Sequence, residues 1–236
     1  EGLSTNVVLV THYWVSGSLT FGLACNELAL LLIGTGTGIL VNSYMRNITG
    51  LIRRDQSCID RAMRTILLAM SDRLSGHTER PRMDFTELQN IIKEALARAK
   101  AHENNALWKQ SRYYTEFVKL RRDQCALLQN MMSAVEGLAV LPEQSALVAD
   151  LLVRVAVAFH RLDNAGALLE EVEACRAAFR ASPLPHTREE FEARALLYQT
   201  VRDLTYLLKA KKRFADQLTE DQIRDLWPEA LQDCTA

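Results

Sequence analysis

Residues 28–54, LALLLIGTGTGILVNSYMRNITGLIRR, divide the chain into an apolar part and a charged part. Between Gly2 and Met45 the only Asp, Glu, Lys or Arg is Glu27. Arginines then follow closely, at Arg46, Arg53, Arg54, Arg61 and Arg64. This asymmetry is typical of a last transmembrane helix that leads into the cytoplasm, because positive residues are retained on the inner side. The sequence therefore predicts a membrane region in residues 1–46 and a cytoplasmic domain in residues 47–236.

The membrane region is expected to be a helical hairpin. Residues 5–24 are mostly apolar and about 20 residues long, which is enough to cross about 30 Å of hydrocarbon. A short polar break at residues 25–27 precedes a second apolar helix over residues 28–45. For His12 in the first span we expect a packed, hydrogen-bonded residue, with a role in a transport pathway or in proton handling as the alternative. The chain opens on Glu1 without a basic leader, so we expect a fragment whose N-terminal membrane helices are missing.

The glycine-rich run at residues 34–38 invites comparison with phosphate-binding loops. A dinucleotide fingerprint would need glycine where Ile39 stands, and a Walker loop would need a lysine that the run lacks. Gly34 and Gly38 instead form a small-xxx-small pair, which lets another membrane helix approach closely, with a ligand role as the alternative. A soluble reading with two buried parallel strands is disfavoured, because no connection of a dozen or more residues separates the apolar runs.

Helical periodicity continues through the charged part. Apolar residues recur at helical spacing, and turn or capping residues separate the expected helices, among them Gly76 as a helix end and Thr187 as an N-cap with Glu190 three residues on. These cover residues 51–75, 84–104, 107–139, 143–163, 165–180, 187–213 and 220–227. The chain is therefore predicted to be all-α, with a transmembrane hairpin followed by an antiparallel multi-helix bundle. Arg121 interrupts an apolar stripe, and we expect it at the rim with its stem packed, or alternatively in a buried ion pair or anion site.

Composition and motifs exclude several classes of function. A net charge of -1 argues against nucleic acid as a partner, since binding phosphates requires a clustered basic excess. The five cysteines are scattered without C-x-x-C pairing, which is the usage of a reducing compartment. No metal-binding or catalytic signature occurs, so we expect no enzyme, no cofactor and no metal site.

Three motifs point to a known family. These are NELALLLIGTGTGILVN at residues 26–42, YYTEFVKLRRDQ at residues 113–124 and LPHTREEFEARA at residues 184–195. Together they resemble the aromatic acid exporter family, member 1 type, a group of FUSC-like bacterial membrane proteins with a helical C-terminal domain. The resemblance covers essentially the whole chain.

The resemblance implies an exporter in the bacterial inner membrane. Its substrates would be small organic acids, including aromatic ones, and its C-terminal domain would lie in the cytoplasm. Candidate substrate-binding or pathway residues are His12, Asn26, Glu27 and Asn42. Motif residues expected to be structural are Gly34, Gly38, Arg121, Gln124, Thr187, Arg188, Glu190, Phe191 and Arg194. Expected partners are membrane lipid, the missing N-terminal transmembrane helices, a small organic anion and further copies of the chain. The alternative is a membrane-anchored helical interaction or regulatory module without transport activity of its own.

Overall fold

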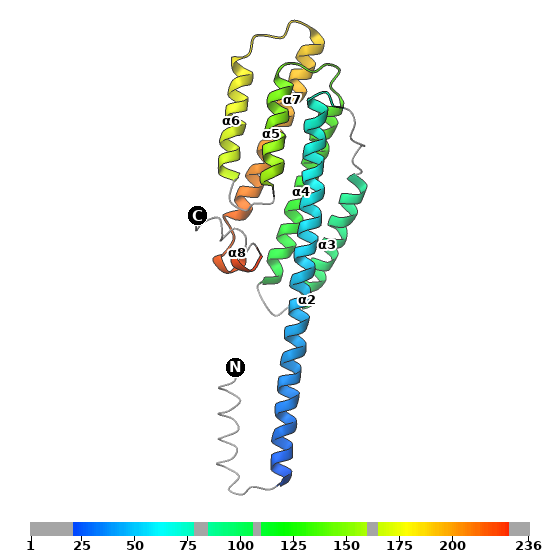
Figure 1. The fold of residues 1–236 in the computed structure, drawn as a ribbon, viewed down its shortest axis with the longest axis vertical. Helices are drawn as coiled ribbons and strands as arrows, with labels where there is room; N and C mark the ends of the chain where they lie inside the picture. Colours follow the sequence, from blue (N-terminus) through cyan, green and yellow to red (C-terminus); the bar gives the residue numbers. More distant parts are fainter. Residues whose placement is uncertain (1–20, 78–84, 106–109, 160–164, 227–236) are drawn as a thin grey trace. The chain divides into compact units, whose positions relative to one another are not determined.

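The computed structural model describes residues 21–77, 85–105, 110–159 and 165–226, and within these ranges all regular structure is helical (Figure 1). The helices are α2 (Phe21–Leu74), α3 (Phe85–Asn105), α4 (Gln110–Glu136), α5 (Gln144–Ala158), α6 (Ala165–Ala181), α7 (Arg188–Ala215) and α8 (Glu220–Leu226). The predicted all-α class is confirmed for the part of the chain that is described.

The first described helix differs from the prediction. A polar break at residues 25–27 and separate helices over 28–45 and 51–75 were expected, but α2 is one helix of 54 residues. No proline interrupts this stretch, and a glycine inside a helix costs only about 1 kcal/mol relative to alanine. The Thr37 hydroxyl also donates to the Ile33 carbonyl at 2.7 Å, which keeps this polar side chain compatible with the helix. Polar residues alone were therefore not a sufficient signal for a turn.

The chain divides into two compact units, Glu1–Leu51 and Ile52–Ala236. The expected first membrane span lies almost entirely outside the described residues. In the described ranges, no helix combines the length and the apolarity that crossing a bilayer requires. The transmembrane hairpin therefore stays a prediction.

The second unit is a helical bundle with α4 and α7 in central positions. Helix α4 packs against α3 and α7, and α7 also packs against α5 and α6 (Figure 1). The second half of α2 joins this core through Ile59, Met63, Ile66 and Met70, all fully buried. Full burial of such a side chain contributes about 1.5–3 kcal/mol, so the continuous apolar stripes are what hold the bundle together.

Local signals end α2 and begin α7. Gly76 has a φ of 79°, and the His77 amide donates to the Asp72 carbonyl at 2.9 Å, which closes α2 with a glycine C-cap. At the start of α7 the Thr187 hydroxyl accepts from the Glu190 amide at 3.1 Å. The Glu190 carboxylate accepts in turn from the His186 amide at 2.9 Å. The predicted helix end at Gly76 and the predicted cap at Thr187 are both confirmed.

Candidate functional site

Two clusters of interacting side chains join the helices of the bundle. We call them the Asp55 cluster, made of Asp55, Glu94, Arg98 and Tyr114, and the Arg121 cluster, made of Asp60, Arg121, Gln124, Phe159 and Lys211. Each cluster joins side chains from several helices, so each ties together segments that are distant in sequence.

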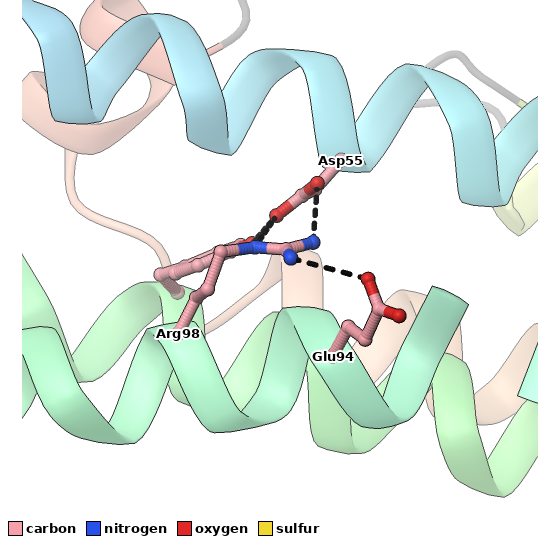
Figure 2. Close-up of polar contacts among 4 residues, drawn as sticks. Asp55, Glu94 and Arg98 are labelled. Atoms are coloured by element: carbon pink, nitrogen blue, oxygen red, sulfur yellow. Dashed lines mark hydrogen bonds and ion pairs between the residues drawn. The ribbon is translucent and has the colours of Figure 1, made fainter. Parts of the chain in front are cut away.

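The Asp55 cluster is built on a bidentate ion pair between α2 and α3 (Figure 2). The Arg98 Nε donates to Asp55 Oδ2 at 3.1 Å and its Nη2 donates to Oδ1 at 2.9 Å. The Tyr114 hydroxyl of α4 also donates to Oδ2, and Arg98 Nη1 reaches Glu94 at 3.4 Å. Asp55 is only 7% exposed, so its carboxylate depends on these donors in place of water.

The protonation states of this cluster are fixed by its geometry. Hydrogen bonding to Asp55 raises the pKa of the Arg98 guanidinium. Burial raises the pKa of the Tyr114 hydroxyl, and the hydrogen bond to the Asp55 carboxylate raises it further. Arg98 and Tyr114 therefore both remain hydrogen-bond donors at every physiological pH. The contacts of this cluster between α2, α3 and α4 are thus independent of pH in that range.

The Arg121 cluster contains an ion pair between α4 and α2. Arg121 is 3% exposed, and its Nη2 lies 2.8 Å from Asp60 Oδ1. Its Nη1 donates to the Gln124 side-chain oxygen at 2.7 Å, and Gln124 Nε2 donates to the Leu207 carbonyl of α7 at 3.1 Å. The expected position of Arg121 at the rim is therefore wrong, and the alternative of a buried ion pair is confirmed. The sequence could not identify Asp60 as its partner, because the two residues lie on different helices.

Aromatic rings enclose the Arg121 guanidinium. Its Cζ lies 4.9 Å from the centre of the Phe117 ring and 4.6 Å from the centre of the Phe159 ring. A contact of this kind contributes about 2 kcal/mol when the cation is desolvated. The rings also keep water from the ion pair, which strengthens its electrostatic attraction.

Lys211 approaches the same group of residues from α7. Its ammonium donates to the backbone carbonyls of Ala158 at 3.1 Å and Phe159 at 2.9 Å, at the C-terminal end of α5. Lys211 is 5% exposed, so its ammonium meets the end of α5 and not bulk solvent. Burial, together with the smaller effect of the Arg121 charge, lowers the pKa of Lys211 to about 7, and Asp60 opposes the change.

Several residues chosen from the sequence organise the start of α7. Arg194 Nη2 pairs with Glu190 Oε1, and its Nη1 donates to the Pro183 carbonyl. Arg188 pairs with Glu192 at the surface, and Phe191 is 62% exposed. These contacts fix the turn that leads into α7.

The candidates in the first unit are placed differently. Asn26, Glu27 and Asn42 all lie within α2, and His12 lies outside the described residues. Among the described residues, no atom lies within 4 Å of a Cβ added at Gly34 or Gly38. The close approach of another membrane helix at these glycines stays a prediction. No group of three His, Cys, Asp or Glu residues suited to a metal ion occurs within the described ranges.

Comparison with known proteins identifies the family. Residues 50–212 match the family model described as "Putative aromatic acid exporter C-terminal domain". Residues 1–45 match the model described as "Aromatic acid exporter family member 1".

A relative and a solved structure agree with these matches. The chain is 26% identical over 216 residues to "Uncharacterized protein YqjA" of Bacillus subtilis (strain 168), which covers 91% of this chain and 67% of that protein. A crystal structure from Clostridium difficile 630, described as that of a "putative membrane protein", shares the fold with a TM-score of 0.65 and 23% identity. The similarity covers 72% of this chain and 99% of that one. The chain therefore belongs to the aromatic acid exporter family, member 1 type.

Proposed function

We propose that the chain is the C-terminal part of a bacterial inner-membrane exporter of small organic acids, aromatic ones among them, with residues 47–236 as its cytoplasmic domain. The observation that carries the proposal is the order of the two family matches, 1–45 followed by 50–212. In this proposal the protein moves its substrate without chemical conversion and requires no cofactor.

The surface of the first part of α2 supports a membrane location. Leu30, Leu31, Leu32 and Ile33 are between 38% and 66% exposed. Successive residues in a helix point about 100° apart, so these four side chains cover most of its circumference. An apolar helix surface of this extent needs a cover of lipid or of other membrane helices. We therefore propose membrane lipid, further transmembrane helices and additional copies of the chain as its neighbours.

The candidate pathway residues follow from the same reasoning. Glu27 is the only carboxylate between Gly2 and Met45, and Asn26 precedes it in α2. Ionisable and amide side chains in an apolar segment are costly, and they are therefore hypotheses for a substrate or ion path. We propose that His12, Asn26, Glu27 and Asn42 contribute to such a path for a small organic anion.

The test is efflux by the full-length protein in the bacterium that encodes it. Cells lacking the protein should accumulate at least one member of a panel of aromatic and aliphatic carboxylic acids, measured inside the cells by mass spectrometry. Wild-type protein should restore export, and Glu27→Gln should restore it less well although the protein is present in equal amount. Unchanged intracellular levels of every acid in the panel would remove the support for an exporter.

The alternative is an interaction module that the membrane segment anchors. It is favoured by an exposed aromatic face on α7, where Phe191 is 62% and Tyr206 is 54% exposed. Under this alternative, residues 50–236 should self-associate or capture a partner when expressed alone, which light scattering would detect as increased mass. Efflux that depends on the full-length protein would favour the exporter instead.

A further inference from the structure

Lys211 connects two helices in the interior of the bundle. Its ammonium nitrogen caps the last carbonyls of α5, those of Ala158 and Phe159. These two acceptors match the two N–H groups of a neutral amine, whereas a charged ammonium has three. The third N–H of a charged ammonium would meet the face of the Phe159 ring, whose centre lies 5.6 Å from the nitrogen, and this cation–π contact only partly replaces the water that the ammonium loses on burial.

Charge in the Arg121 cluster is unbalanced when Lys211 is protonated. Arg121 and Lys211 both lie over the ring of Phe159, at 4.6 Å and 5.6 Å from its centre. Asp60 of α2 pairs with Arg121, and no carboxylate in the described part of the chain forms an ion pair with Lys211. The cluster thus holds two cations and one anion when the lysine is charged, and one of each when it is neutral.

From this arrangement we propose that Lys211 makes the contact between the end of α5 and α7 sensitive to pH. Uptake of a proton by Lys211 loosens this contact, which we call the junction. The inference goes beyond export, because it concerns how the helical domain responds to the pH around it. It does not depend on which compound is transported.

The direction of the response follows from the charges that face Lys211. Arg121 on α4 repels a charged ammonium and Asp60 on α2 attracts it. From the described residues at the end of α5, the Ala158 and Phe159 carbonyls and the Phe159 ring face it. Burial and Arg121 outweigh Asp60, so the pKa of Lys211 falls from 10.5 to about 7 while the junction is closed. When the junction opens, water restores the ordinary value, and opening is therefore coupled to proton uptake. With these two pKa values, the equilibrium constant for opening rises about tenfold from about pH 8 to about pH 6.

Hydrogen exchange of the full chain measures this opening. Amides near the end of α5 and in the second half of α7 should show an opening constant that rises about tenfold over that pH range, once intrinsic exchange rates are divided out. Lys211→Met removes the titrating group and should make the opening constant independent of pH. The matched control is Lys212→Met, because Lys212 is exposed on the same helix and should leave the wild-type response intact.

Two further measurements keep the inference testable if Lys211→Met fails to fold. Lys211→Arg retains a cation that does not deprotonate, so opening should be raised and independent of pH. In the wild-type chain, carbon-13 shifts of labelled lysines should show one lysine titrating about three pH units below the others. A wild-type opening constant that does not change with pH, the same pH response in Lys211→Met or Lys211→Arg, or lysines that all titrate together would overturn the proposal.

Discussion

Removing the Arg121 side-chain charge should strongly destabilise the bundle. Arg121→Met keeps an unbranched apolar stem between the Phe117 and Phe159 rings but removes the guanidinium that pairs with Asp60. Loss of one member of a buried ion pair typically costs 3–5 kcal/mol. The Asp60 side chain is 14% exposed, so some water reaches it, and we expect a loss at the lower end, about 3 kcal/mol.

A double-mutant cycle separates the ion pair from the packing. Asp60→Leu should cost more, about 4 kcal/mol, because it leaves the Arg121 charge, whose side chain is 4% exposed, beside Lys211. Combining Asp60→Leu with Arg121→Met removes both charges, and should cost only about 2 kcal/mol for the unpaired Gln124 and the lost ring contacts. The cycle should therefore show a coupling free energy of about 5 kcal/mol, which is the amount by which the two single costs together exceed the cost of the double variant.

Urea unfolding of the full chain, followed by circular dichroism in one fixed detergent, measures each difference in free energy. The matched control is Arg122→Met, on the next residue of α4, whose side chain is 58% exposed and pairs only with exposed Asp123. That change should cost at most about 0.5 kcal/mol. A cost below about 1 kcal/mol for Arg121→Met, or single costs that simply add, would refute a desolvated Asp60–Arg121 pair.

Three further changes test other contacts by thermal unfolding of the full chain in the same detergent. Thr187→Ala removes the acceptor for the Glu190 amide and should cost about 1 kcal/mol, seen as a lower melting temperature. Asp55→Asn breaks the bidentate contact with Arg98 and should lower the free energy of unfolding by about 2–3 kcal/mol. The same change at a surface carboxylate should cost less. Burial raises the pKa of Asp203, so the folded chain binds a proton more readily than the unfolded chain and loses stability as pH rises through that interval. Asp203→Asn should therefore raise the melting temperature at neutral pH, and the gain should vanish in acid.

Helix ends were predictable because their causes are local. The Thr187 cap and the Gly76 C-cap each depend on a few consecutive residues, and both occur as the sequence indicated. The predicted break at residues 25–27 is wrong because polar residues without proline are only a weak local signal for a turn. Cys25 and Asn26 are exposed in α2, where polar side chains meet no steric obstacle to helix continuation.

The partners of the buried charges could not be predicted from the sequence, for a different reason. Asp55, Arg121 and Lys211 each fall in phase with the apolar stripe of their own helix, as Lys211 does three residues after buried Leu208. Such a residue either lies at the rim with its stem packed or is buried with a partner, and periodicity alone does not decide between these two positions. Identifying their partners requires the axial register between helices, which depends on how every core side chain packs. Phe159 and Lys211 lie 52 positions apart in the sequence, so the helical periodicity around Lys211 could not identify the Phe159 carbonyl as its acceptor.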